Sequence, residues 1–220
     1  CLPGILPPMS EEEKQEVSAI YSAAGQLEDG TLIQERPFVS PHHTVSVYAM
    51  TGGGAVPKPG MVTLAHRGVL FLDEMAEFKR QTLDVLRQPM EEGKIFLARS
   101  RGNFVYPADF MLLGATNPCP CGYYPDRNRC RCQDWEVRRY LARLSGPLLD
   151  RMDLCCQIKQ TPIRKLWEKR EASYIDSDKN GSKWMREQVL EARERQQMRC
   201  RGAATRENGR LSPGEILKYG

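Results

Sequence analysis

The sequence predicts an α/β fold in which helices flank a parallel β-sheet. Two short apolar runs, at 69–72 and 111–115, are each followed by polar residues, as expected for strands that are buried on both faces of such a sheet. Segments with helical periodicity lie before, between and after these runs. The chain has 220 residues, of which 40% are hydrophobic, so it is long enough to bury a core of this kind.

The first helix is predicted over residues 10–24. Ser10 and Glu13 have the spacing of a capping box, apolar residues then recur at helical spacing, and Gly25 ends the pattern. The segment 30–67 is rich in Gly, Pro, Ser and His, which predicts a long loop with short strands inside it. Loops of this length in a compact domain are usually functional.

A second helix is predicted after the first strand, with Pro89 and Gly93 at its end. Its apolar positions are Phe78, Thr82, Leu83, Leu86 and Met90. Residues 94–98 and 103–106 then alternate between apolar and polar, which predicts a β-hairpin. The second buried strand, 111–115, ends at Thr116 and Asn117.

Three further elements are predicted beyond the second strand. Asp134 is expected to cap a helix, and a third strand is expected at 153–158. The apolar face of that helix comprises Val137, Tyr140, Leu141 and Leu144. A highly charged helix follows at 183–200, with Trp184, Met185 and Val189 on its apolar side, and we expect the tail from 202 to be weakly ordered or truncated.

Composition points to a cytoplasmic globular protein. No apolar run reaches the roughly 18 residues that a membrane span requires, and the N-terminus lacks the layout of a signal peptide. The net charge of +4 decides little by itself. The opening at Cys1, without an initiator Met and in the middle of a pattern, suggests a fragment of a longer chain.

The most informative motif is the apolar run 69–72 that leads into Asp73 and Glu74. In P-loop ATPases, an Asp at the end of a buried strand binds Mg²⁺, and a following Glu orients and deprotonates the attacking water. Asp73 and Glu74 fit these two roles. However, the sequence contains no G-x-x-x-x-G-K-[ST] phosphate loop, so half of the expected ATP site is absent.

Two further residues are candidates for the same site. Asn117 ends the second strand and could share a nucleophilic water with Glu74, although a turn-forming or capping Asn is the simpler alternative. Arg151 lies between a helix and a strand, where it could serve as an arginine finger toward a neighbouring subunit's nucleotide. An ordinary salt bridge to Asp150 or Asp153 is the alternative.

Four of the eight cysteines have the spacing of a metal site, namely Cys119, Cys121, Cys130 and Cys132. Four thiolates within fourteen residues suit tetrahedral Zn²⁺, and four protein ligands leave no open position, so the zinc would be structural. Free thiols in a surface loop are the alternative. Cys155 and Cys156 lie in the predicted third strand and are interpreted as small core residues.

Lys94, Arg99 and Arg101 are predicted to form a basic hairpin tip that contacts a DNA backbone, because such contacts need reach and charge. A solvated turn explains so few charges equally well. His42, His43 and His66 could suggest a metal site, but His42 and His43 are adjacent in a loop, and catalytic or ligand roles are the less favoured interpretation of these histidines.

Taken together, these segments resemble the bacterial magnesium-chelatase-like AAA+ ATPases of the YifB/ComM type, which are related to the MCM helicases and to the ATPase subunit of magnesium chelatase. The resemblance covers nearly the whole chain. The matching segments are 36–38, 40–44, 52–54, 64–74, 117–122 and 144–151.

The resemblance implies a role for each candidate residue. Asp73 and Glu74 would be the Walker B pair, Asn117 would be sensor 1, and Arg151 would be the trans-acting arginine finger, although Asp150 replaces the Ser of the MCM motif. The implied AAA+ core spans 1–160, with a helix-2 insertion at 38–67, a pre-sensor-1 hairpin at 94–106 and a zinc loop at 119–132. Residues 161–220 would begin a C-terminal helical region.

The resemblance also implies a function. The family places its phosphate loop just before a segment like 2–8, so this part of the chain is expected to be inactive, because it would lack Walker A and the full helical lid. The intact protein is expected to be a cytoplasmic homohexamer that uses ATP and Mg²⁺ to move on single-stranded or branched DNA and promote branch migration of incoming DNA. The alternatives are a chelatase-type remodeller of a protein partner and a non-enzymatic module stabilised by zinc.

Overall fold

The computed structural model describes residues 2–27, 31–54, 57–99, 102–158, 181–200, 209 and 211–219. The chain divides into two compact units. One comprises residues 9–156, and the other comprises residues 1–8 with residues 157–220. Within the described ranges, no helix combines the length and the apolar character needed to cross a bilayer.

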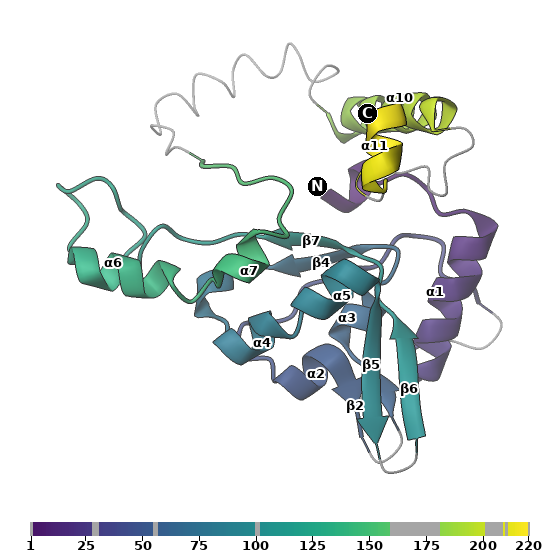
Figure 1. Ribbon diagram of the computed structural model, residues 1–220, viewed down its shortest axis with the longest axis horizontal. Coiled ribbons are helices and arrows are strands. Elements are labelled where there is room, and N and C mark those ends of the chain that lie inside the picture. The colour runs from purple at the N-terminus through teal and green to yellow at the C-terminus, as the bar shows by residue number, and fades with distance from the viewer. Residues whose placement is uncertain are drawn as a thin grey trace. The chain divides into compact units, whose positions relative to one another are not determined.

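The larger unit is built on a three-stranded parallel sheet, which confirms the predicted α/β fold. The strand order is β1 (Phe38–Val39), β4 (Val69–Leu72) and β7 (Met111–Gly114), so β4 is the central strand. Leu70 pairs with Val39 on one side and with Leu112 on the other. In Figure 1, the helices α2 (Val47–Thr51), α3 (Met61–Leu64), α4 (Arg80–Asp84) and α5 (Arg87–Glu92) lie on the same side of β4 and β7.

The hydrophobic core lies between this face of the sheet and the helices. It contains residues from the central strand, from the helices and from the hairpin, including Met50, Leu70, Leu72, Phe78, Leu83, Leu86 and Ile95. The opposite face is less covered, because Phe38, Met111 and Leu113 are exposed there. The strand β7 was therefore predicted correctly as a strand but wrongly as a buried one, since it forms an edge of the described sheet.

The first predicted helix is confirmed as α1 (Glu11–Ala23). The Ser10 hydroxyl accepts a hydrogen bond from the Glu13 N–H, and the Ser10 N–H donates to the Glu13 carboxylate, which completes the capping box. The segment expected to be a loop contains β1, α2, α3 and a small antiparallel pair, β2 (Gly52–Gly53) and β3 (Lys58–Pro59). Gly60 and Gly52 allow close backbone contact in this pair, because a Cβ on Gly60 would lie 2.2 Å from the Gly52 nitrogen.

The second predicted helix is present as two short helices, α4 and α5, which follow the 3-10 turn η2 (Met75–Glu77). Pro89 does not end a helix as predicted but is the third residue of α5. This position tolerates proline because the first N–H groups of a helix have no intrahelical partner. Gly93 ends α5 with a φ of 65°, as predicted.

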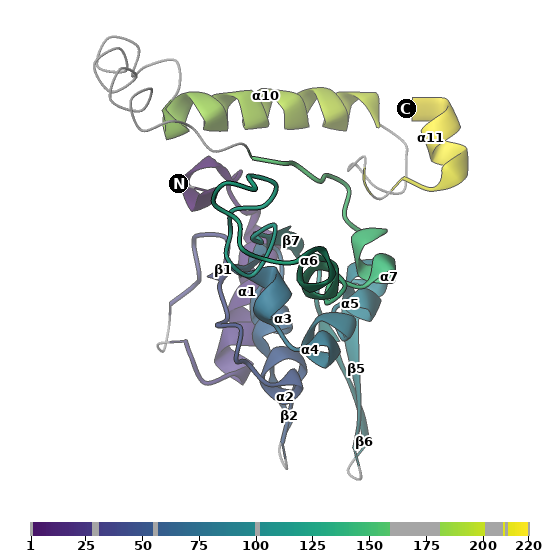
Figure 2. The ribbon, with the colours of Figure 1, turned by 90° about the vertical axis from the view of Figure 1, so that its left-hand side faces the viewer.

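The predicted hairpin is confirmed as β5 (Lys94–Arg99) and β6 (Gly102–Pro107), which Figure 2 shows extending away from the helices beside the β2–β3 pair. Helix α6 (Asp134–Leu141) is also present, but Gln133 rather than Asp134 is its N-cap. The Gln133 N–H donates to the Glu136 carboxylate over 2.7 Å. Helix α7 (Gly146–Leu149) follows.

The third predicted strand is not formed. Residues 153–158 have no strand structure, Leu154 is 83% exposed and Ile158 is 92% exposed. Cys155 and Cys156 are exposed as well, so they are not the core residues that we expected. An apolar pattern becomes a strand only where a neighbouring strand supplies backbone hydrogen bonds, and no described strand pairs with this segment.

The smaller unit contains η1 (Leu2–Ile5), α10 (Ser182–Arg199) and α11 (Pro213–Tyr219). Helix α10 confirms the predicted charged helix, and η1 packs against it. Trp184 and Met185 on its predicted apolar side are about 40% exposed. The prediction of a weakly ordered tail from 202 falls largely outside the described residues, although α11 lies within it.

Candidate functional site

Asp73 and Glu74 directly follow the central strand β4, at its carboxyl end. Both residues are exposed, and Oδ1 of Asp73 accepts a hydrogen bond of 2.9 Å from the Glu74 N–H. Glu74 adopts a left-handed backbone conformation with a φ of 49°, which costs about 1–3 kcal/mol for a residue other than glycine. This turn leads the chain into η2 and leaves two adjacent carboxylates at the edge of the sheet.

Asn117 lies at the same edge. It follows β7, whose last residue, Gly114, pairs with the last residue of β4, Leu72. The Met75 N–H donates to the Ala115 carbonyl over 2.7 Å, so the two chain segments remain in contact beyond the strands. Glu74 and Asn117 thus both lie at the carboxyl ends of adjacent strands, as we expected from a parallel sheet. That the two residues bind the same nucleophilic water remains a prediction.

His43 is a neighbour of Glu74 that sequence reasoning missed. Its Nδ1 lies 3.6 Å from Oε2 of Glu74. His43 follows β1, which pairs with β4 on the side opposite β7. The parallel pairing of β1 with β4 brings the segment that carries His43 near the end of β4, and no sequence pattern indicated this contact.

Arg151 is held within its own chain. Its guanidinium forms an ion pair with Glu91 and donates to the Pro147 carbonyl, and its Nε is buried without a hydrogen-bond partner among the described residues. The salt-bridge alternative named Asp150 or Asp153, but the partner is Glu91 of α5. The arginine-finger role remains a prediction.

The predicted basic tip is not one cluster. Lys94 pairs with Pro107 and Arg99 pairs with Gly102, so Lys94 lies at the base of the hairpin and Arg99 at the other end. The two positions are five residue steps apart along the strand, which corresponds to about 17 Å. The side chain of Arg99 and the whole of Arg101 lie outside the described residues.

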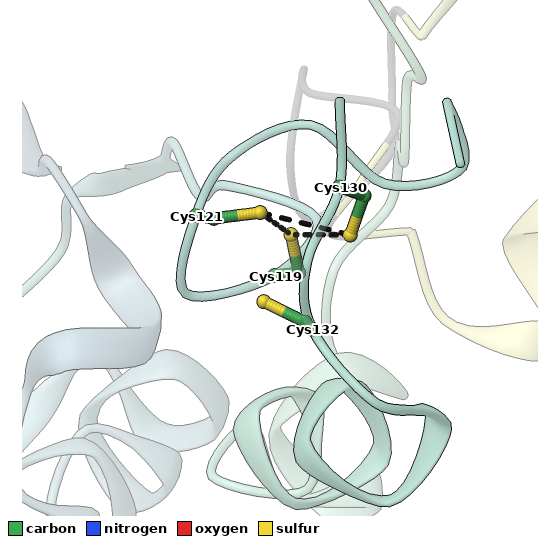
Figure 3. A group of neighbouring side chains, drawn as sticks. All are labelled: Cys119, Cys121, Cys130 and Cys132. Carbon is green, nitrogen blue, oxygen red and sulfur yellow. Dashed lines mark hydrogen bonds between the residues drawn. The ribbon is translucent and has the colours of Figure 1, made fainter. Parts of the chain in front are cut away.

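The four predicted zinc ligands come together in one group (Figure 3). All four sulfur atoms lie within 4.8 Å of one another, and the three pairs among Cys119, Cys121 and Cys130 are 3.4–3.8 Å apart. A tetrahedral zinc ion with four thiolates at 2.3 Å requires sulfur–sulfur separations of about 3.8 Å. The donor set and its spacing therefore fit Zn²⁺.

The surroundings favour a thiolate at Cys121 but not at Cys130, because burial raises the pKa of the Cys130 thiol. A backbone hydrogen bond from Tyr123 lowers the pKa of the Cys121 thiol to about 6. Cys119 and Cys130 are buried and pack with Val137 of α6, so the loop has a small core of its own. Outside the group, the guanidinium of Arg129 stacks on the ring of Tyr123, with 4.1 Å between its Cζ and the ring centroid.

A polar network that sequence reasoning missed supports the start of β4. Arg67 donates to Glu16 of α1 and to Asp109 before β7, over 2.8 Å in each case. His66 is buried, and its Nδ1 accepts a hydrogen bond from the Asp109 N–H while its Nε2 lies 3.4 Å from Glu16. His66 is thus a structural residue, and the hydrogen bond from Arg67 lowers the pKa of Glu16.

Comparison with known proteins gives the family. Residues 1–166 match the family model described as magnesium chelatase, subunit ChlI. The chain is 46% identical over 218 residues to the uncharacterized protein YifB of Salmonella typhimurium, and this match covers 99% of the present chain and 41% of YifB. It is 40% identical over 199 residues to the competence protein ComM of Haemophilus influenzae, covering 90% of this chain and 38% of that protein.

A more distant relative is the magnesium-chelatase 38 kDa subunit of Acidiphilium rubrum, which is 28% identical over 111 residues, half of this chain and 26% of that protein. The chain spans about two-fifths of the length of YifB and ComM. Its parallel sheet flanked by helices, with an Asp-Glu pair after the central strand, agrees with an AAA+-like domain. The chain therefore belongs to the magnesium chelatase ChlI family of AAA+-type ATPases, together with YifB and ComM.

Proposed function

We propose that this chain is the central part of a hexameric AAA+ ATPase that couples ATP hydrolysis to movement on DNA. The observation that carries the proposal is the pair Asp73 and Glu74 at the carboxyl end of the central parallel strand, beside Asn117 at the end of the next strand. Ligands in open parallel sheets bind at this edge. The family supports the ATPase step, and the name of ComM as a competence protein supports the DNA step.

The roles follow from chemistry and position. The exposed carboxylate of Asp73 is the kind of ligand that Mg²⁺ prefers, and a bound Mg²⁺ would neutralise charge on the phosphates of ATP. Glu74 accepts a proton from the attacking water, and Asn117 orients that water. Arg151 stabilises the transition state in a neighbouring subunit, after exchanging its ion pair with Glu91 for the phosphate.

The ATPase assignment is tested in the full-length protein. Replacing Glu74 with Gln should retain nucleotide binding while lowering turnover at least about 100-fold, since the amide cannot accept the proton. The matched control is Glu77→Gln, a change in the same turn at a carboxylate that pairs with Arg143 instead. Turnover near normal in Glu74→Gln would remove Glu74 from the base role.

The DNA assignment is tested at the hairpin. Replacing Arg99 and Arg101 with Ala should weaken DNA binding and flatten its dependence on salt by about one unit of slope for each phosphate that is no longer bound. Lys94→Ala at the hairpin base provides the comparison. An equal effect of Lys94→Ala would place the DNA along the hairpin rather than at its end, and no effect of any change would place it elsewhere.

The four-cysteine loop is proposed to bind one structural zinc ion through Cys119, Cys121, Cys130 and Cys132. Such an ion supplies folding energy and no open coordination position. Metal analysis of protein purified without chelator should give one zinc per chain, and a smaller content would contradict the assignment.

A chelatase-type remodeller that acts on a protein partner is the second candidate, and the family model and the Acidiphilium relative favour it. ATP turnover of the full-length protein, measured with and without branched DNA, separates the two candidates. Stimulation by DNA supports the motor. Turnover that is indifferent to DNA supports the remodeller.

A further inference from the structure

The carboxylate of Glu74 faces the imidazole of His43. The Nδ1 atom of His43 lies 3.6 Å from Oε2 of Glu74, which is slightly longer than a hydrogen bond. Hydrogen bonds at catalytic sites are often long in the absence of substrate and shorten when it binds. Among the residues that the structure describes, this is the only ion-pair partner of the Glu74 side chain.

The surrounding residues hold the His43 ring in place. One neighbour is the His42 ring, whose centroid is 4.1 Å away, and another is Phe78, whose ring meets it edge-on at an angle of 75°. Phe78 is only 1% exposed and is therefore fixed by its own packing, so it limits the movement of the His43 ring on that side. The Val45 N–H donates to the His42 carbonyl over 2.9 Å, which closes the turn that carries the histidine.

The backbone of Glu74 is fixed as well, so its remaining freedom is in the side chain. Its carbonyl accepts a hydrogen bond of 2.7 Å from the Glu77 N–H, and the next N–H, of Met75, is bound to Ala115. The Glu74 side chain is nevertheless 53% exposed. Fixing a glutamate side chain in one rotamer costs up to about 2 kcal/mol of conformational entropy, so a partner that orients Glu74 must offset this cost.

We propose that His43 is a positioning residue for ATP hydrolysis. In this assignment, which rests on the proposed function, the Nδ1–H of His43 donates to the Glu74 carboxylate and keeps it directed toward the attacking water. The strand order supports it, because His43 approaches the central strand from the β1 side and Asn117 from the β7 side. The carboxyl end of β4 is therefore bordered by the segments that carry His43 and Asn117, one on each side.

The test uses ATP turnover of the full-length protein. His43→Ala should lower kcat about 10- to 100-fold while the KM for ATP changes less than about twofold, because a misplaced base slows the chemical step without weakening nucleotide binding. His43→Asn should recover most of the loss, because the Asn side-chain N–H can occupy nearly the position of Nδ1–H. His43→Gln places its amide near Nε2 and should recover little.

The matched control is His66→Asn. His66 also has a glutamate neighbour, at 3.4 Å, but this pair belongs to the structural network at the start of β4. The His66→Asn substitution should therefore lower the thermal midpoint of unfolding, while kcat of the folded enzyme stays within about threefold of normal.

The inference is overturned if His43→Ala has normal kcat while Glu74→Gln is inactive, if Asn rescues no better than Gln, or if His66→Asn lowers kcat as much as His43→Ala does. A rise in kcat on removing His43 would also overturn it, since His43 would then restrain Glu74 rather than orient it. Normal turnover in Glu74→Gln identifies a different failure, that of the base role itself.

Discussion

Gly68 provides a sharp test of how the central strand is positioned. It immediately precedes β4, and an added Cβ would lie 2.0 Å from the Pro37 carbonyl oxygen, where contacts below 3.0 Å are essentially never seen. That oxygen accepts the hydrogen bond of 2.8 Å from the Val69 N–H at the start of the β1–β4 pairing. In Gly68→Ala, the oxygen must therefore move away by about 1 Å, which breaks this hydrogen bond.

The cost has two parts. Overpacking a tight site costs about 1–3 kcal/mol. Loss of the hydrogen bond adds about 0.5–1.5 kcal/mol. We therefore expect Gly68→Ala to lower the free energy of unfolding by about 1.5–4.5 kcal/mol.

Urea denaturation of the 220-residue chain, followed by far-UV circular dichroism, measures this change. Amide hydrogen exchange at Val69 should accelerate, since its acceptor has moved. Gly214→Ala in α11 is the matched control, because no atom lies within 4 Å of its added Cβ and alanine favours a helix over glycine by up to about 1 kcal/mol. A loss below about 1 kcal/mol in Gly68→Ala, with unchanged exchange at Val69, would show that the added Cβ fits without displacing the Pro37 carbonyl.

Three further changes test other parts of the fold. Leu70→Ala, at a fully buried position of β4, should cost about 2–5 kcal/mol in urea denaturation, and a smaller loss would show that the core refills the cavity. The hydrogen bond from Arg67 lowers the pKa of Glu16 below 4.5, so the ionised Glu16 stabilises the fold above pH 4.5, and this stabilisation is lost as the pH falls through the lowered pKa. The loss of stability caused by Glu16→Gln should therefore shrink between pH 7 and pH 3. A loss that stays constant over this range would contradict the linkage. Cys119→Ser should reduce bound zinc and lower the thermal midpoint, whereas retained zinc would exclude Cys119 as a ligand.

The elements that sequence reasoning predicted correctly are those with local signals. The capping box at Ser10 fixes the start of α1, and the alternation around 94–106 fixes the hairpin. The strand at 153–158 was predicted wrongly because its formation depends on a neighbouring edge, which no local pattern can specify. The exposure of β7 was missed for the same reason, since the position of a strand in a sheet is set by distant segments.

The candidate site divides in the same way. The cysteine spacing was sufficient to predict that four sulfur atoms gather, and the two strand ends were sufficient to bring Asn117 to the edge that carries Glu74. The contact between His43 and Glu74, and the pairing of Arg151 with Glu91, join residues 31 and 60 positions apart. Such partners follow only from the folded arrangement.

The hydroxyl of Tyr106, near the base of the hairpin, donates to the Pro57 carbonyl beside the β2–β3 pair over 2.8 Å. This bond joins two extensions that lie far apart in the sequence and side by side in Figure 2. A hydrogen bond of this kind contributes about 1 kcal/mol, which is more than thermal energy at room temperature. The two extensions are therefore tied together near their bases, and the chain continues from Tyr106 to Asp109, whose carboxylate accepts a hydrogen bond from Arg67 just before the strand that carries Asp73 and Glu74.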